Sequence, residues 1–306
     1  MLRTRLAVLV ATLAAGAAFL PAGATALVQQ GETAGAQQGV TEVTGPLVVA
    51  AGDISCTPGQ ATTGTTCRDA DTAELVQSYD PELVLGLGDL QYEYGTLAAF
   101  RQAYAETWGA FKATTRPVPG NHEYYTAGAA GYYDYFDRKR PGYYAFDVGR
   151  WRVYALNSNC AHVSCDREAR WLDRKMTERP RRCTAVTMHH PRYSSGTHGS
   201  TPTVRRLWRV ALEHGTDLAV AGHDHHYERF RRMNAAGGFS RTGIMSFVSG
   251  AGGRSHYPIK DVRRGSVVRD DDSFGVLALT LGKGRFAWEY QTVDGTVVDS
   301  GTARCR

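Results

Sequence analysis

The sequence predicts an α/β sandwich with mixed β-sheets. Short apolar runs recur along the chain, each followed by glycine or polar residues, which is typical of buried strands. Stretches with helical periodicity separate several of these runs, so strands and helices alternate. The C-terminal part instead has strand-like runs joined by Gly-Lys-Gly and Asp-Gly turns, which indicates a β-rich meander.

The expected strands of the alternating part cover residues 47–51, 83–87, 154–156, 185–188, 218–221 and 245–248. A helix is expected downstream of Pro202, a residue suited to a first helical turn, because apolar positions then repeat at helical spacing. These positions are Leu207, Val210, Ala211 and His214. The C-terminal meander should consist of residues 274–281, 286–292 and 296–298.

The first 26 residues have the layout of a secretory signal peptide. Arg3 and Arg5 precede an apolar run over residues 6–20, and Ala24-Thr25-Ala26 offers small residues for cleavage. The run is too short to span a membrane and no later run reaches that length, so no membrane anchor is expected after cleavage. Secretion is therefore predicted, and the abundance of Ala, Gly and Arg favours a GC-rich bacterial source.

The remaining chain is expected to contain a linker and one large domain. Residues 27–45, rich in Gln, Gly, Thr and Ala, have no hydrophobic period and indicate a flexible linker. Residues 46–306 are long enough for a single domain with a large core. The oligomeric state is not predicted.

All six cysteines lie beyond the signal peptide and indicate three disulfide bonds, because an even number in an oxidising compartment is usually paired. No two of them have zinc-finger spacing. Six cysteines allow fifteen pairing patterns, so the sequence leaves the connectivity open. Proximity favours Cys56 with Cys67, Cys160 with Cys165, and Cys183 with Cys305 as a clasp for the C-terminus.

The net charge argues against one class of partner. The formal charge is +5, and about +3 remains without Arg3 and Arg5, which is too little to favour nucleic acid by its field alone. No nucleic acid partner is therefore expected. A modestly cationic surface suits a small anionic substrate.

Five polar clusters lie at or just beyond the ends of expected strands or extended segments, where open α/β sheets bind their ligands. A single Gly-Asp pair is usually only a turn, and alternate surface histidines are common. Together, however, the Asp, Tyr, Asn and His side chains supply oxygen and imidazole ligands that suit iron, zinc and manganese. The clusters are Gly52-Asp53, Gly88-Asp89-Leu90-Gln91-Tyr92, Gly120-Asn121-His122-Glu123, Met188-His189-His190-Pro191 and Gly222-His223-Asp224-His225.

These clusters resemble those of the calcineurin-like metallophosphoesterase superfamily, and within it the purple acid phosphatases, over most of the chain from about residue 46. The segment from Asp89 to Tyr92 is similar to the Gly-Asp-x-x-Tyr motif of the purple branch, where the tyrosine is a phenolate ligand of ferric iron. Most other branches have a histidine two residues after the first aspartate, whereas this chain has Ser55 there. The segment from Gly222 to Arg229 also resembles the purple branch.

The resemblance implies a four-layer α-β-β-α sandwich with two mixed sheets and a dinuclear metal site at strand ends, formed by residues 46–306 as the catalytic domain. Asp89 would bridge the two metals. Asp53, Tyr92 and His225 would complete the first site, and Asn121, His189 and His223 the second. The first site would collect more anionic ligands, so we expect Fe(III) there and Fe(II), Zn(II) or Mn(II) in the second.

Three further residues are expected to act near the substrate, again by resemblance. His122 should bind the phosphate and protonate the leaving oxygen, with Glu123 orienting it. His198, nine residues after His189, falls where the family keeps another substrate-facing histidine. The neighbouring position, a histidine in plant relatives, is Gly199 here, so recognition of the leaving group is expected to differ.

The predicted function is that of a secreted, metal-dependent phosphoric ester hydrolase acting on small-molecule phosphate monoesters. Two cations about 3.5–4 Å apart would polarise the phosphoryl oxygens and lower the pKa of a bound water, so that metal-bound hydroxide attacks phosphorus in line. No Cys-x5-Arg or P-loop signature indicates a covalent intermediate.

Two other functions stay open on the sequence. A phosphodiesterase or nucleotidase would use the same scaffold with different loops. A secreted protein that sequesters metal or phosphate without turnover is less favoured, because binding alone does not require His122 and Glu123.

Several residues near the clusters have no assigned role. No ligand role is expected for His190, His226 or His256. Arg254 either meets phosphate or is a solvated loop residue. Five tyrosines either line a substrate groove or cover the sandwich; they are Tyr124, Tyr125, Tyr132, Tyr133 and Tyr135.

Overall fold

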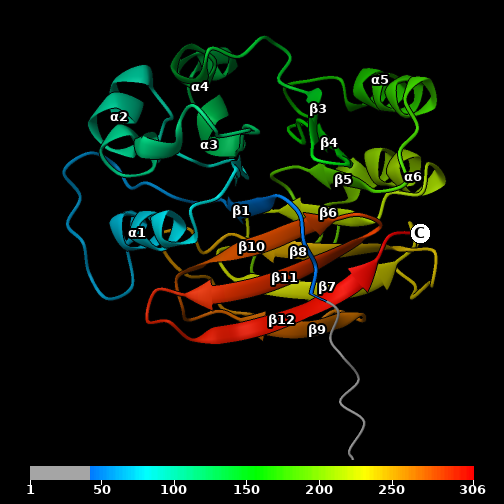
Figure 1. The fold of residues 1–306 in the computed structure, drawn as a ribbon. Helices are drawn as coiled ribbons and strands as arrows, with labels where there is room; N and C mark the ends of the chain where they lie inside the picture. The colour runs from blue at the N-terminus through cyan, green and yellow to red at the C-terminus, as the bar shows by residue number, and fades with distance from the viewer. Residues whose placement is uncertain (1–41) are drawn as a thin grey trace, which may run out of the picture. The chain divides into compact units, whose positions relative to one another are not determined.

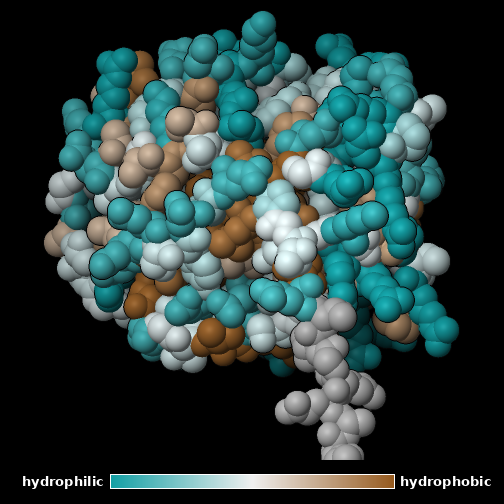
Figure 2. Space-filling model, viewed as in Figure 1, coloured by the Kyte–Doolittle hydropathy of each residue, from teal (hydrophilic) through white to brown (hydrophobic). Residues whose placement is uncertain are grey.

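The computed structural model describes residues 42–306, in which two β-sheets pack together with helices on their outer faces (Figure 1). The predicted signal peptide and residues 27–41 of the predicted linker lie outside the described residues. None of the described helices is long and apolar enough to cross a membrane. In the view of Figure 1, hydrophilic residues cover most of the surface, with smaller hydrophobic areas between them (Figure 2).

The first sheet has five strands in the order β12-β11-β10-β1-β2. β1 and β2 run parallel, whereas β10, β11 and β12 form the antiparallel meander that the sequence predicts. β1 lies inside the sheet and is buried along almost its whole length, as its continuous apolar run predicts. The bounds are β1 Leu47–Ala51, β2 Leu83–Gly86, β10 Gly275–Gly282, β11 Arg285–Thr292 and β12 Val297–Arg304.

The second sheet has seven strands in the order β3-β4-β5-β6-β8-β7-β9. β4, β5, β6 and β8 are parallel to one another, and β3, β7 and β9 pair antiparallel. Both sheets are therefore mixed. The bounds are β3 Tyr144–Val148, β4 Trp151–Ala155, β5 Thr184–Thr187, β6 Leu218–Ala221, β7 Tyr227–Met233, β8 Ile244–Ser249 and β9 Ser266–Asp270.

Three apolar clusters separate four layers. The inner faces of the sheets meet through residues such as Leu85 and Val220. The outer face of the first sheet, with Val84, packs against α1, α2 and α4, and that of the second, with Val186, packs against α5 and α6. The predicted α-β-β-α sandwich is confirmed. The α-helices are α1 Asp69–Tyr79, α2 Leu97–Gln102, α3 Asn121–Tyr124, α4 Ala130–Phe136, α5 Cys165–Glu178 and α6 Arg205–Glu213; the 3-10 turns are Tyr104–Glu106, Trp108–Phe111, Ala127–Ala129 and Pro202–Val204.

α6 shows how local sequence sets an element. Pro202 opens a 3-10 turn that leads into the helix, and the residues that face the second sheet include Leu207 and Ala211. The helix ends at Glu213, and Gly215 follows with a φ of +76°, a conformation that few other residues adopt readily. The predicted helix is confirmed.

β3, β7 and β9 were not predicted from the sequence, and β12 extends beyond the predicted residues 296–298. β3, β9 and β12 are edge strands whose residues are largely exposed or half-buried. An edge strand needs no continuous apolar run, so its sequence lacks the signal that marks a buried strand. β7 is rich in arginine and contains only scattered apolar residues.

The three disulfide pairs favoured by proximity are present: Cys56–Cys67, Cys160–Cys165 and Cys183–Cys305. Their partners lie 11, 5 and 122 residues apart in the sequence. Cys183 directly precedes β5 and Cys305 directly follows β12, so the last bridge joins the two sheets as the predicted clasp.

Removing the Cys183–Cys305 bridge is expected to destabilise the protein more than removing Cys160–Cys165. Loss of chain entropy in the unfolded state predicts about 5 kcal/mol for the long loop and about 2 kcal/mol for the short one. Denaturant unfolding of the two double-serine variants would measure the difference. Equal losses would show that unfolded-state entropy does not dominate, and six free thiols in the wild-type protein would contradict the pairing.

Candidate dinuclear metal site

The polar clusters of the sequence meet at the carboxyl ends of parallel strands from both sheets. Asp53 follows β1 and Asp89 follows β2, while His189 follows β5 and His223 follows β6. The backbone N–H of His223 donates to Asp53 Oδ2 at 2.7 Å, although the two residues are 170 positions apart. The fold therefore gathers side chains that are remote in the sequence into one buried site.

The backbone around these residues is tightly packed and locally strained. The backbones of three residues have φ values in a region that residues other than glycine rarely adopt: 60° for Asp53, 48° for Asp89 and 74° for His223. A Cβ atom at Gly222 would lie 2.6 Å from Asp53 Oδ2, and one at Gly120 would collide with the Asp89 carboxylate. Glycine at these two positions is thus required for the close approach of backbone to carboxylate.

The first group of polar side chains surrounds the phenol of Tyr92. Its Oη donates to Asp53 Oδ1 at 2.9 Å and lies 3.0 Å from His225 Nε2 and 3.3 Å from Asp89 Oδ2. His225 Nδ1 is hydrogen-bonded to Ser255 Oγ at 2.9 Å, which turns Nε2 toward the phenol. The four residues Asp53, Asp89, Tyr92 and His225 are each at most 2% exposed.

The second group surrounds Nε2 of His189. This atom lies 3.1 Å from Asn121 Oδ1, 3.2 Å from His223 Nδ1 and 3.2 Å from Asp89 Oδ2. His189 Nδ1 donates to the carbonyl of Leu87 at 2.9 Å, and since a carbonyl only accepts, Nε2 is the nitrogen that would offer its lone pair to a metal ion in this group. Asp89 Oδ2 thus lies within 3.3 Å of both Tyr92 Oη and His189 Nε2.

The charges of this site depend on burial and on close neighbours. Burial opposes ionisation of Asp89, yet the neighbouring His189 keeps the pKa of that carboxyl well below its usual range. Burial opposes a charge on His189 too, but Asp89 raises the pKa of this imidazole to about 9. Burial, followed by the carboxylates of Asp53 and Asp89, raises the pKa of Tyr92 well above its ordinary value, so this phenol stays neutral unless a cation approaches.

The donor atoms fit bound metal ions. Among the described residues, no lysine or arginine forms an ion pair with Asp53 or Asp89, although both carboxylates are buried. Buried carboxylates without such a partner favour a bound cation. Asp53, Asp89 and His189 each offer a ligand atom within 4.8 Å of the others. Carboxylate, phenol, amide and imidazole donors are those that iron, zinc and manganese accept.

His122 lies at the rim of this site. Its backbone N–H donates to Asp89 Oδ1 at 2.8 Å, and its ring centroid lies 4.2 Å from that of Tyr92. The carbonyl of Glu93 accepts a hydrogen bond from His122 Nδ1 at 2.8 Å. The ring is therefore held with Nε2 on the side of Asp89, whose Oδ2 is 3.9 Å away.

Glu123 has contacts that differ from the predicted orienting role. It is completely buried, and its carboxylate accepts backbone hydrogen bonds from Gly120, Asp89, Leu90 and Gln91 rather than from the ring of His122. Consecutive residues of a helix point in different directions, so Glu123 faces away from its neighbour's ring. It holds the backbone that carries Asp89, and Glu93 contacts His122 instead. Burial, and next the Asp89 carboxylate, raise the pKa of Glu123 to about 8.

His198 lies over the second group, and its ring stacks on that of His223 with centroids 4.5 Å apart. Asp224 holds this loop, because its carboxylate accepts from the backbone N–H of His198 at 2.8 Å and of Gly199 at 3.0 Å. The sequence had assigned no role to Asp224. Its place in the sequence between the candidate ligands His223 and His225 was the available signal.

The three histidines without an expected role have other contacts. His190 Nδ1 is hydrogen-bonded to Ser158 Oγ at 2.9 Å, and burial, followed by the neighbouring His189, lowers the pKa of His190 to about 3. His226 forms a buried pair with Glu228 at 3.2 Å, and His256 packs on Phe274. His190 nevertheless offers a nitrogen close to those of His189 and His223.

The predicted cluster of tyrosines belongs largely to the core. Four of the five are buried in the helical layer over the first sheet, and only Tyr125 is exposed. Tyr125 lies beside His122, with ring centroids 4.5 Å apart. Covering of the sandwich is therefore the main role, and Tyr125 is the member that borders the site.

Comparisons with known proteins agree with this geometry. The family model described as calcineurin-like phosphoesterase matches residues 47–227. Purple acid phosphatase 23 of Arabidopsis thaliana is 26% identical over 213 residues, which cover 56% of this chain and 46% of that protein. The chain thus spans about half the length of this curated relative.

Solved structures share the fold. A purple acid phosphatase from yellow lupin (Lupinus luteus) seeds superposes with a TM-score of 0.69 and 20% identity over 86% of this chain and 54% of that one. The anchor protein of the inner membrane complex of Plasmodium has a TM-score of 0.65 and 11% identity over 86% and 90%. The resemblance that the clusters and Tyr92 indicate is confirmed, and the chain belongs to the calcineurin-like phosphoesterase family.

Proposed function

We propose that residues 46–306 are the catalytic domain of a secreted phosphatase that hydrolyses phosphate monoesters with two metal ions. The observation that carries the proposal is the convergence of Tyr92 Oη with Asp53, Asp89 and His225, all within 3.3 Å. Similarity to purple acid phosphatases supports the assignment. The three disulfide bonds support an oxidising compartment and hence export.

The proposed ligands divide as the two groups of side chains do. Asp53, Tyr92 and His225 would hold Fe(III), with Asp89 shared. Asn121, His189 and His223 would hold Fe(II), Zn(II) or Mn(II). The first group offers more anionic donors once Tyr92 ionises, so it suits the ion of higher charge.

When bound, the two ions supply positive charge that polarises the phosphoryl oxygens and lowers the pKa of the attacking water. The side chains around them position the ester. His122 Nε2 faces the site and would donate a proton to the leaving oxygen, while His198, which is exposed above His223, would contact the ester from the other group. Glu123 would keep Asp89 in place through its backbone.

A substrate panel tests the reaction class. Turnover of a nitrophenyl monoester well above that of a bis-nitrophenyl diester supports a monoesterase. The reverse preference would favour a phosphodiesterase on the same scaffold. Failure of metal-loaded protein to hydrolyse any ester in a broad panel would leave a metal- or phosphate-binding protein.

Replacing Tyr92 by phenylalanine should abolish a visible colour. Phenolate bound to ferric iron absorbs visible light by charge transfer, so we expect the oxidised wild-type protein to be pink to purple. Asp53, Asp89 and His225 remain in the variant, so it should still bind metal and keep some activity. Absorption spectroscopy with metal analysis measures both. A colourless, active wild-type protein that contains only zinc or manganese would contradict the iron assignment, although a two-metal hydrolase would remain.

A further inference from the structure

Arg254 and Glu93 form an ion pair beside the first group of proposed ligands, with Arg254 Nη2 2.6 Å from Glu93 Oε1. We infer that they are a positioning pair with two tasks: Glu93 holds the ring of His122, and Arg254 keeps a positive charge against the ring of Tyr92. This inference deepens the proposed function and rests on it. Neither residue is a proposed metal ligand.

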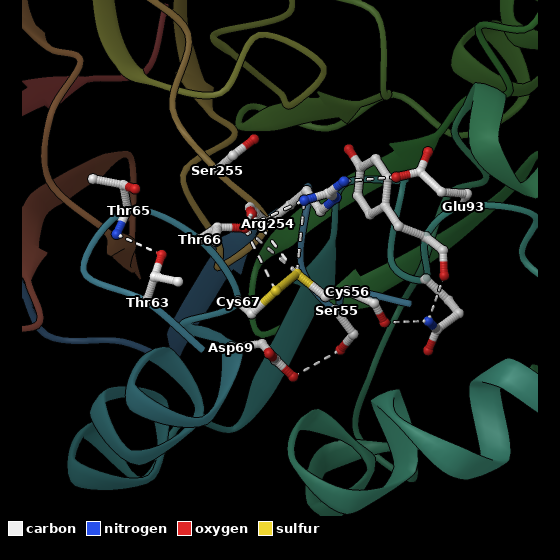
Figure 3. The surroundings of a disulfide bond; sticks show 12 residues. Ser55, Cys56, Thr63, Thr65, Thr66, Cys67, Asp69, Glu93, Arg254 and Ser255 are labelled. Carbon is white, nitrogen blue, oxygen red and sulfur yellow. Dashed lines mark hydrogen bonds and ion pairs between the residues drawn. A yellow bond between two sulfur atoms is a disulfide. The ribbon is translucent and has the colours of Figure 1, made fainter. Parts of the chain in front are cut away.

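The guanidinium of Arg254 is held in a defined place. Its Cζ lies 5.1 Å from the centroid of the Tyr92 ring, a cation–π distance, and its side chain is 20% exposed. Nη1 donates to Thr66 Oγ1 at 3.3 Å and approaches Cys56 Sγ at 3.8 Å. Figure 3 shows Arg254 between the Cys56–Cys67 disulfide and Glu93. The arginine is therefore not the solvated loop residue that was one of the two alternatives left open by the sequence.

The backbone of Arg254 is fixed as well. Its N–H donates to the carbonyl of Asp53 at 3.0 Å, and its carbonyl accepts from Thr66 Oγ1 at 2.7 Å and from the N–H of Cys67 at 3.3 Å. The Cys56–Cys67 bridge thus braces the segment that carries Arg254, and the same segment is tied to a proposed metal ligand. A surface loop without a positional role would not need these contacts.

Glu93 extends the pair to His122. Its Oε2 lies 3.3 Å from His122 Nδ1, the same atom that donates to the Glu93 carbonyl at 2.8 Å. Backbone and carboxylate of one residue therefore act on one ring nitrogen. Arg254 contacts the other carboxylate oxygen, Oε1, so both oxygens of the Glu93 side chain have a fixed partner. The resulting orientation leaves Nε2 of His122 available on the substrate side.

The charge of Arg254 should also be visible in the colour of the protein. A cation close to an aromatic ring stabilises electrons on that ring, and more strongly when the ring carries the negative charge of a phenolate. More energy is then needed to move an electron from the phenolate to iron. Loss of the arginine charge should therefore shift the absorption maximum to longer wavelength.

The test compares Arg254→Gln, Glu93→Gln and a control, Arg206→Gln, in the full chain loaded with metal. The control removes an arginine from an exposed ion pair, in which Arg206 Nη1 lies 2.7 Å from Asp166 Oδ1. Three quantities are measured: metal content, the absorption maximum of the oxidised protein, and the ratio of rates on an alkyl phosphate and a nitrophenyl phosphate.

We expect Arg254→Gln to shift the maximum to longer wavelength with metal content unchanged. Glu93→Gln should lower the rate ratio by about 10-fold or more, because misorientation of His122 harms the ester that needs a proton most. Arg206→Gln should change neither quantity. An absorption maximum and a rate ratio equal to those of the wild type in both site variants, with metals bound, would overturn the inference.

Three further outcomes are possible: a variant that does not fold, a colourless wild-type protein, and a protein without phosphatase activity. If Arg254→Gln does not fold, Arg254→Lys takes its place. The lysine keeps the positive charge, so the absorption maximum should stay near that of the wild type. A shift of the absorption maximum as large as that expected for loss of the charge would count against the electrostatic role. A colourless wild-type protein overturns the iron assignment and the task of Arg254, while the rate ratio still decides the task of Glu93. Absence of phosphatase activity contradicts the proposed function itself, and the colour then decides the task of Arg254.

Discussion

Replacing His122 by alanine is expected to lower the rate of phosphate-ester hydrolysis by roughly 10²–10⁴-fold while both metal ions stay bound. The ring of His122 belongs to neither group of proposed ligands, so its removal takes away no ligand atom. Its backbone N–H, which donates to Asp89 Oδ1, is retained in the variant. The loss should therefore come from the missing proton donor and not from a disordered metal site.

The dependence on the leaving group distinguishes an acid from a binding residue. An alkoxide is a poor leaving group and needs the proton, whereas nitrophenolate departs with little help, so the alkyl phosphate should suffer the larger loss. Steady-state rates on both esters, with metal analysis of the same sample, make the measurement. Equal losses on the two esters would leave His122 as a phosphate-binding residue only.

Asparagine in place of Asp89 is expected to lower metal content and rate together. Asp89 Oδ2 lies within 3.3 Å of Tyr92 Oη in the first group and of His189 Nε2 in the second, so its change should weaken both sites. Substitution of groups that merely orient ligands costs about 10–100-fold in affinity or activity, and loss of a shared anionic ligand should cost at least that much. The amide oxygen can still accept from the N–H of His122, which favours a folded variant.

His189→Ala should behave similarly but with its main effect on the second ion, because His189 Nε2 is central to that group. Metal analysis of both variants beside Asp166→Asn, an exposed aspartate in the Arg206 ion pair, gives the comparison. Full occupancy of both sites in either site variant would remove that residue from the set of ligands.

The buried strands and the candidate site could be predicted because the sequence patterns that indicate them each span only a few consecutive residues. The apolar run of β1 and the spacing of Asp89 and Tyr92 are visible within a few residues. The pairing of Glu93 with Arg254 is not, since the two residues are 161 positions apart and resemble ordinary surface charges in the sequence. Glu123 illustrates the opposite case: the family resemblance implied that it orients His122, whereas its carboxylate accepts backbone hydrogen bonds instead.

The place of β1 has a consequence for biosynthesis. β1 pairs on one side with β2, the next strand along the chain, where Val48 lies opposite Leu83. On its other side it pairs with β10, where Leu47 lies opposite Thr280. While the ribosome is still making the middle of the protein, one edge of β1 has no partner, because β10 has yet to be synthesised. Contacts so distant along the chain also form slowly. In a nascent polypeptide with this topology, the first sheet can close only after synthesis has passed β10.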